Sequence, residues 1–456
     1  MRKRLVLAVS SIVLVVGVLV ALSYRLRPGF EFIRMETVPK LVPSEPSSPD
    51  ISWTRQERAE TPDSMRSAEL HGGALSGELF ASEREPQNAC CSAEQNGFRS
   101  LRHARFPDRN IFTTVGLNFQ HLLSGRAKYW EFNGYMGNFA PRREPSTLRV
   151  HSQNSAGLFW AAANSRWNAN SEMTFTLGNE NCVDLEFRTA LETVPEVEYL
   201  VYMWASYLRD VKDMAMRFWG VRNLEMWGSE WGSGAVGWAR LDEWKAPNPV
   251  DSRHGIVQYL GTPTLAYDDG IPPLNLQSYE YCAFLLPFFF GVVDGDRDPA
   301  TADDDMAYIM MFDQADHIRF AMWDFSENPR TPVWDWQYVL CNPRPAMTYG
   351  YRARLVYKPY MGLADVTAEY VKWLKSLDTP RNELRIEVDP PDAATLFPKD
   401  IAGTYSDRVQ VCFGVNPSRG WAFDHWEGNV TRKEFRFTKI TLKHDEVVRA
   451  VCRRIE

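Results

Sequence analysis

Residues 303–360 constrain the fold more than any other stretch, because they hold four consecutive strand-like segments, and polar residues alternate with apolar or aromatic neighbours in the last three. The segments cover residues 306–312, 317–323, 334–340 and 349–357, and a polar turn at residues 313–316 joins the first two. Alternation with a period of two is typical of strands that bury one face and expose the other. The polar members are Arg319, Asp324, Asp335, Gln337, Arg352 and Arg354. We therefore predict a sheet with these residues on its wet face, on which the rest of the globular part packs.

Further strand patterns recur at residues 111–119, 173–177, 182–190, 199–207 and 214–221, with no helical period between them. Strands that follow one another in this way predict an antiparallel sandwich rather than a βαβ fold. The one convincing helix covers residues 363–377 and closes a core domain of residues 105–377. The apolar residues that fall on one face of this helix are Val366, Tyr370, Trp373 and Leu374.

The predicted fold class is therefore mainly β. It comprises a large antiparallel β-sandwich core with one terminal helix, a small C-terminal β-module at residues 378–456 and an N-terminal transmembrane helix at residues 1–24. Residues 25–104, rich in Pro, Ser, Glu and Arg, are predicted to form a disordered linker.

The transmembrane prediction rests on the apolar run of residues 5–22, which follows three basic residues. A spanning helix needs about 20 residues, whereas the apolar region of an export signal has about 7–15. We favour an uncleaved anchor, with a cleaved export signal at residues 21–23 as the alternative. The basic cluster predicts a single-pass protein of the bacterial cell membrane whose bulk is extracytoplasmic.

Composition excludes some classes of function. A net charge of −7 and a pI near 5.8 argue against nucleic-acid binding, which needs a basic face. The seven cysteines include no Cys-x-x-Cys pair with companion histidines, which argues against a zinc knuckle or a thioredoxin motif. The 16 Trp, 18 Tyr and 25 Phe residues exceed what a core alone usually takes, so we expect some rings to line a groove.

A glycine-spaced loop at residues 228–238 presents Glu230, Trp231 and Trp238. Rings of this kind stack on the apolar face of a sugar, and a carboxylate accepts hydrogen bonds from its hydroxyls. The alternative is a hairpin loop whose rings fold back on the core. Trp130, Tyr279 and Arg319 complete the predicted substrate-binding set.

His121 and His254 are the candidate general bases, and Glu230 is the candidate carboxylate. His121 follows a strand and precedes an aromatic loop, while His254 lies close to Tyr259. The alternative for each is a structural histidine. Other carboxylates, Asp335 among them, are interpreted as solvated strand positions or partners of arginine.

Oxygen ligands recur at calcium-loop spacing in Asp294, Asp296, Asp298 and Asp305. Pro299 stands where such a loop needs glycine, and Asp305 replaces the usual glutamate. A polar hairpin loop is the alternative to this candidate calcium site.

The C-terminal residues carry a family resemblance. The turn Gly420-Trp-Ala-Phe-Asp-His-Trp-Glu-Gly428 and the strand Val447-Val-Arg-Ala-Val451 resemble the divergent InlB B-repeat family over residues 384–452. That resemblance implies a small β-module of a bacterial surface protein, a spacer or adhesive unit without catalytic residues. Cys452 departs from it, because the family has an aromatic residue there.

The core resembles the galactose-mutarotase and concanavalin-like superfamilies of β-sandwich carbohydrate-active proteins, at residues 334–338 and 349–359. The sequence thus predicts a membrane-tethered extracytoplasmic carbohydrate-binding or carbohydrate-processing protein whose partner is a polysaccharide or other glycan. The alternative is a non-catalytic cell-envelope scaffold or adhesion protein that contacts other proteins through its C-terminal module. Whether the protein is an enzyme is open at this point.

Overall fold

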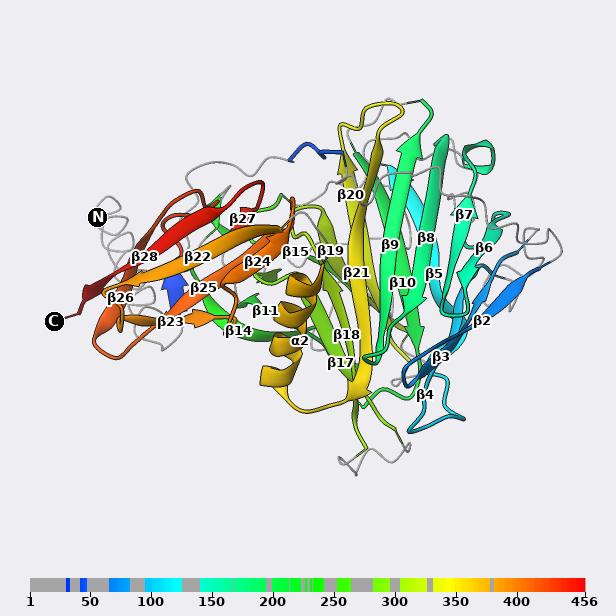
Figure 1. Ribbon diagram of the computed structural model, residues 1–456, viewed down its shortest axis with the longest axis horizontal. Helices are drawn as coiled ribbons and strands as arrows, with labels where there is room; N and C mark the ends of the chain where they lie inside the picture. Colours follow the sequence, from blue (N-terminus) through cyan, green and yellow to red (C-terminus); the bar gives the residue numbers. More distant parts are fainter. Residues whose placement is uncertain are drawn as a thin grey trace, which may run out of the picture.

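The computed structural model describes residues 30–32, 42–46, 65–82, 95–124, 140–165, 167–193, 199–212, 214–222, 226–227, 230–231, 233–241, 252–263, 282–295, 304–325, 331–377 and 381–455. Within these ranges the fold is mainly β, as predicted, and its large sheets are antiparallel. Two sheets form a sandwich, and a smaller β-module stands at one end of it (Figure 1).

One layer of the sandwich is an eleven-stranded sheet. Its order is β1 (Phe30–Phe32), β14 (Ser233–Leu241), β11 (Met216–Arg222), β17 (Phe288–Val293), β18 (Met306–Phe312), β21 (Thr348–Pro359), β9 (Cys182–Leu191), β8 (Ala169–Leu177), β7 (Ser155–Trp160) and β6 (Thr147–Ser152), with β16 (Cys282–Phe284) also paired to β11.

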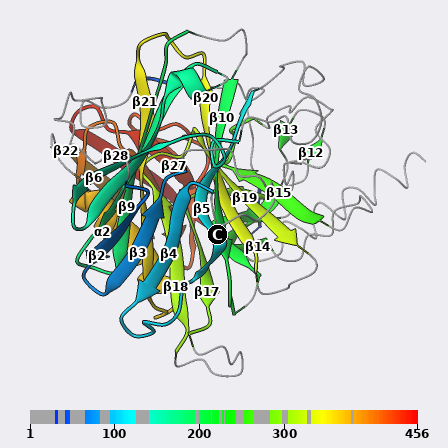
Figure 2. The ribbon, with the colours of Figure 1, turned by 90° about the vertical axis from the view of Figure 1, so that its right-hand side faces the viewer.

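The other layer is an eight-stranded sheet. Its order is β15 (Ser252–Gln258), β19 (Ile318–Phe325), β20 (Val333–Cys341), β10 (Tyr199–Leu208), β5 (Phe112–Ser124), β4 (Gly97–His103), β3 (Leu75–Phe80) and β2 (Ser67–Gly72). Strands β2 to β5 lie side by side in Figure 2. Strands β2, β3 and β4 fall within residues 25–104, so the predicted disordered linker is corrected there: these residues bury apolar side chains such as Leu79 and Leu101 in the core.

Aromatic rings fill the space between the two sheets. Trp204 stacks on Phe119, with ring centroids 5.0 Å apart, and on Trp336, at 6.1 Å. The layers approach so closely that a Cβ on Gly291 would stand 1.8 Å from the indole of Trp334. No aromatic residue is among the exposed large apolar residues of the described ranges. The sandwich therefore uses many of the rings that the sequence offers, and a groove lined by others stays a prediction.

The four segments of residues 303–360 do not belong to one sheet. Strands β18 and β21 lie in the eleven-stranded sheet, whereas β19 and β20 lie in the eight-stranded sheet. The turn at residues 313–316 carries the chain from one layer to the other, and Phe312 then faces Phe320 across the core with centroids 6.0 Å apart. Alternation predicts which side chains of a strand are buried. It does not predict the sheet to which the strand belongs, because strands of both sheets bury their rings in the same core.

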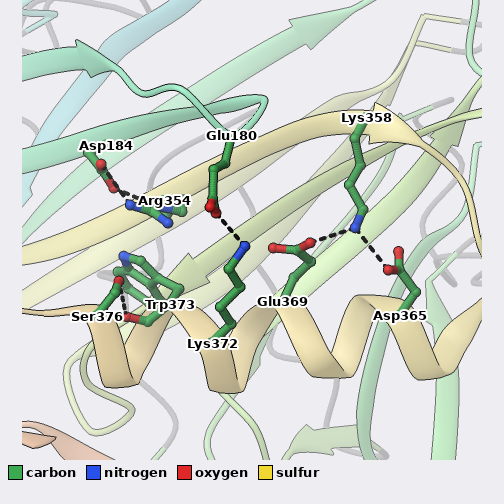
Figure 3. Close-up of polar contacts among 9 residues, drawn as sticks. All are labelled: Glu180, Asp184, Arg354, Lys358, Asp365, Glu369, Lys372, Trp373 and Ser376. Atoms are coloured by element: carbon green, nitrogen blue, oxygen red, sulfur yellow. Dashed lines mark hydrogen bonds and ion pairs between the residues drawn. The ribbon is translucent and has the colours of Figure 1, made fainter. Parts of the chain in front are cut away.

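Helix α2 (Leu363–Ser376) confirms the predicted helix, with Val366, Tyr370, Trp373 and Leu374 buried. Tyr370 contacts Phe288 of β17, with ring centroids 5.1 Å apart, so the helix covers the eleven-stranded sheet on the side away from the sandwich core. Ion pairs hold it there (Figure 3): Lys358 of β21 binds Asp365 at 2.9 Å and Glu369 at 2.6 Å.

The C-terminal module contains two sheets. One has the order β24 (Gly403–Ser406), β22 (Arg381–Asp389), β28 (Glu446–Arg454) and β26 (Trp421–Glu427), and the other β23 (Ala394–Phe397), β25 (Gln410–Pro417) and β27 (Phe437–Thr441). The module packs directly on the core, where Phe397 lies against Trp219 with ring centroids 4.2 Å apart. Lys439 and Asp316 form an ion pair across the same boundary.

In the part of the chain that the structure describes, no helix has the length and apolar character needed to cross a bilayer. The predicted anchor, residues 1–24, lies outside that part.

We expect the Trp373→Ala variant to lower the free energy of unfolding by about 3–5 kcal/mol, because a buried indole is replaced by a cavity. The neighbouring Lys372→Ala variant is the matched control. Lys372 and its partner Glu180 are 56% and 59% exposed, so losing that ion pair costs at most about 1 kcal/mol. Urea unfolding of both variants measures the difference, and equal losses would mean that α2 is held by its ion pairs instead.

Candidate functional site

The outer face of the eight-stranded sheet, which points away from the eleven-stranded sheet, is buried. A small apolar cluster lies on it, separate from the sandwich core, and consists of Leu123, Tyr199, Val201, Met203, Ile256, Ala321, Val339 and Cys341. Polar side chains share this face: Arg319 is 1% exposed, Asp335 2% and Gln337 0%. The sequence predicts these three on a wet face, and the structure corrects this.

The register brings these side chains into two rows across the sheet. The first row is Gln258, Arg319, Gln337, Met203 and His121, and the second is Ile256, Ala321, Asp335, Ala205 and Asn118. Asp335 therefore stands between two alanines, whose side chains offer it no hydrogen bond. Among the described residues, its Oδ1 atom has no hydrogen-bond partner.

Burial raises the pKa of the Asp335 carboxyl well above its usual range. The backbone hydrogen bond from Ser206 and the charge of Arg142 oppose this rise but do not cancel it. A raised pKa favours the protonated form of the carboxyl, which can donate its proton.

A bulge in β5, the strand on the far side of β10 from Asp335, places two more polar side chains on this part of the sheet. His121 pairs with Met203 and Phe119 pairs with Trp204, so Gln120 is an extra residue in the ladder. Bulges of this kind redirect side chains and recur beside active sites. Gln120 Nε2 donates a hydrogen bond of 2.9 Å to the hydroxyl of Tyr207, the outer-face residue two positions beyond Ala205.

Arg142 joins the same group from the segment before β6. Its Nη1 donates to Gln120 Oε1 at 2.8 Å and to the Tyr207 hydroxyl at 3.2 Å. We call Gln120, His121, Arg142, Tyr207 and Asp335 the polar band.

Burial shifts the pKa of His121 in the opposite direction from that of Asp335. Burial lowers it well below its usual value, and the charges of Arg142 and Arg143 lower it further. His121 Nδ1 has no hydrogen-bond partner among the described residues. The polar band thus combines a carboxyl whose protonated form is favoured with an imidazole whose neutral form is favoured, and these forms can donate and accept a proton respectively.

The structure brings together only some of the residues that the sequence predicts. His121 and Arg319 share one row of the outer face, and His254 pairs with Trp323 on the neighbouring β15, although its side chain is outside the described part. Glu230 and Trp231 belong to a short pair of strands, β12 (Met226–Trp227) and β13 (Glu230–Trp231), and their side chains are likewise outside it. Trp130 and Tyr279 lie wholly outside the described residues.

Trp238 is not part of this site. It lies on β14 of the other sheet, half-buried against Trp219 at 5.6 Å and Phe290 at 5.5 Å between ring centroids. Its ring packs beside the contact between core and module, where Trp219 meets Phe397, and its sugar-stacking role stays a prediction.

Two of the four predicted calcium ligands are described. Asp305 Oδ1 lies 3.2 Å from Lys212 Nζ, and Asp294 is buried nearby. The described residues contain no group of three or more His, Cys, Asp or Glu side chains that could hold a metal. Asp296 and Asp298 are outside them, so calcium binding stays a prediction.

Sequence reasoning missed Asp335, Arg142 and Tyr207. The sequence of β10, which pairs with the strand of Asp335, could have indicated its burial. Apolar residues occupy both faces of β10, and such a pattern predicts a strand buried on both sides. Polar residues on a strand paired to it are then buried too. Arg142 gives no such signal, because it reaches the polar band from an irregular segment.

A cavity of about 200 Å³ at the boundary of core and module is a weaker candidate. Its charged groups already neutralise one another, with Arg352 3.1 Å from Asp313 and Lys443 3.2 Å from Glu45. Residues 42–46 lie across it, where Ser44 N donates to the Cys341 carbonyl at 3.0 Å.

Comparisons with solved structures give partial overlaps. The chain is similar to a putative aldose 1-epimerase from Escherichia coli K12 (TM-score 0.34, 9% identity, 64% of this chain and 99% of that one). It is also similar to galactose 1-epimerase from Lactobacillus acidophilus NCFM (0.32, 6%, 66% and 97%) and to a heparan sulfate lyase from Pedobacter heparinus (0.31, 9%, 63% and 34%). At these TM-scores the likeness carries no argument about activity.

No protein-family model matches the chain, and no curated protein matches it either. The resemblance of residues 384–452 to the InlB B-repeat therefore finds no support. What the protein does has to be argued from the polar band.

The pKa of Asp335 predicts a pH dependence of stability. Because its folded-state pKa is raised, the wild-type protein loses stability as pH rises from about 4, the unfolded value, through the folded pKa. The Asp335→Asn variant has no such loss, so its stability relative to wild type should rise by up to about 1.4 kcal/mol per pH unit in that window. Urea unfolding of both proteins between pH 4 and 8 measures this. A variant that weakens relative to wild type as pH rises would show that Asp335 is ionised in the fold.

Proposed function

We propose that this protein binds a carbohydrate at the polar band and transfers protons on it. The observation that carries the proposal is that Asp335 and His121 share one buried sheet face, where burial raises the pKa of the carboxyl and lowers that of the imidazole. The same face supplies a guanidinium and a phenol, in Arg142 and Tyr207, for hydrogen bonds to hydroxyls. Such a mixture of donors and acceptors suits a ligand rich in hydroxyl groups.

The sheet sets the separation of the two proton-transferring groups. Asp335 on β20 and His121 on β5 are separated by β10 and by two residues along the strands, so their backbones lie about 12 Å apart. A group of the size of one sugar ring fits between side chains that start from these two positions. In the proposed reaction, Asp335 gives its proton to an oxygen on one side of the ring, and His121 takes a proton from a hydroxyl on the other.

The fixed surroundings of both groups favour catalysis over binding alone. Neither side chain needs to be desolvated when a ligand arrives, because the fold has already removed both from water. The pKa of Asp335 is shifted in the direction that general acid catalysis requires, and the lowered pKa of His121 keeps its imidazole neutral and able to accept a proton. Strongly shifted pKa values cluster at functional sites.

We expect Asp335→Asn to lower turnover of the carbohydrate by about 100- to 10,000-fold while its affinity changes little, because the amide keeps the shape of the carboxyl but cannot donate its acidic proton. His121→Gln should have a similar effect, since the amide removes the base. A panel of reducing sugars and oligosaccharides, followed by NMR for anomeric exchange and new reducing ends, measures turnover.

The Trp238→Phe variant tests whether turnover takes place at the polar band or at the site that the sequence predicts around Trp238. It should leave turnover near the wild-type value, because Trp238 lies on the opposite sheet. Loss of turnover in Trp238→Phe without loss in Asp335→Asn would move the site to the eleven-stranded sheet. Absence of both binding and turnover in the wild type would favour the scaffold alternative, in which the C-terminal module contacts other proteins.

We also propose a cellular location for the protein. The apolar run of residues 5–22 behind three basic residues supports a membrane-tethered, extracytoplasmic protein. We expect the full chain to stay with bacterial membranes in alkaline carbonate, and a chain that begins at residue 25 to be released. Release of the full chain, or a mature form that begins near residue 24, would support the cleaved export signal instead.

A further inference from the structure

Arg142 is a buried cation that is rigidly placed. Its side chain is 7% exposed, and its carbonyl accepts a 2.8 Å hydrogen bond from Asn96 N. The preceding residue is fixed from two sides, because Asn96 Nδ2 and Trp160 Nε1 donate to the Pro141 carbonyl at 3.0 and 2.7 Å. The guanidinium therefore keeps its position in the polar band without help from a ligand.

The partners of this guanidinium in the described part of the chain are neutral. Both hydrogen bonds leave from Nη1, to the Gln120 amide oxygen and the Tyr207 hydroxyl. The Nε atom is buried and has no hydrogen-bond partner there. No carboxylate of the described residues forms an ion pair with Arg142, although arginine is rarely buried unless it is paired.

The carboxyl of Asp335 lies close enough for Arg142 to lower its pKa, but burial raises that pKa well above its usual range and so favours the neutral form. The charge of Arg142 therefore favours a negative group at this place, and a guanidinium presents a planar fork that fits a carboxylate or a sulfate.

We infer that the carbohydrate bound at the polar band is acidic, and that Arg142 anchors its carboxylate or sulfate group. This inference rests on the proposed function and narrows its substrate class. Arg142 acts here as a specificity-determining residue, while Asp335 and His121 handle protons. The anion would supply the charge that the fold leaves unmatched beside Gln120 and Tyr207.

Titration calorimetry with matched ligands tests the inference. One pair is an oligogalacturonate and the same oligosaccharide after reduction of its carboxyl groups, and the other is a sulfated galacto-oligosaccharide and its desulfated form. We expect the wild type to bind the acidic member of at least one pair roughly 10- to 100-fold more tightly, as one charge-assisted hydrogen-bond pair provides. The two pairs distinguish carboxylate from sulfate as the recognised group.

Variants assign the preference to Arg142. Arg142→Gln should bind acidic and neutral ligands equally, and Arg142→Lys should keep part of the preference, because it keeps the charge but loses the fork. Arg149→Gln is the matched control and should keep the full preference, since Arg149 is 33% exposed and already pairs with Glu172 at 2.9 Å. Near-ultraviolet circular dichroism of each variant checks that the fold is intact.

The wild-type result alone decides the inference if Arg142→Gln fails to fold. Equal affinity for acidic and neutral ligands would overturn the anion anchor and leave the proposed function standing. No binding of either kind would overturn both. A preference that survives in a folded Arg142→Gln protein would assign the anchor to another residue and contradict the role given to Arg142.

Discussion

The packing of aromatic rings between two antiparallel sheets is the constraint on which the rest of this structure depends. Trp204 lies between Phe119 and Trp336 in a nearly parallel stack, and these three rings come from three neighbouring strands of the eight-stranded sheet. Large rings have few rotamers and fill space densely, so strands that carry them have one register only. Because the inner face of β5, β10 and β20 is fixed in this way, the side chains on the outer face are fixed as well.

That coupling explains why a polar group can be held so firmly on the outer face. Asp335 is flanked in its own strand by Trp334 and Trp336, both fully buried in the core. The bulge at Gln120 interrupts the ladder of β5 between Phe119 and His121, so the core keeps its ring while the outer face gains one polar residue. The sandwich thus provides the rigid scaffold that proton transfer needs, with the site on strands and not on loops.

Local patterns in the sequence predict individual strands and helices but not which of them pair. The strand predicted at residues 306–312 coincides with β18, and the helix predicted at residues 363–377 differs from α2 by one residue. Both predictions depend on the types of neighbouring residues. The placement of β18 and β19 in different sheets depends instead on long-range packing, which one sequence does not show. For the same reason the sequence predicts His121 as a candidate by its residue type, but not that Arg142 lies close to it.

The burial of Asp335 is itself an argument for function. Three other acids of the fold meet a cation: Asp313 faces Arg352 at 3.1 Å, Asp184 faces Arg354 at 2.7 Å, and the buried Glu172 faces Arg149. Asp335 is more buried than any of these three, stands between two alanines and keeps one oxygen without a partner in the described structure. An apolar residue at this position would fold at lower cost, because an unsatisfied buried polar atom is destabilising. The cost of keeping a carboxyl here supports the proton-transferring role that we propose for it.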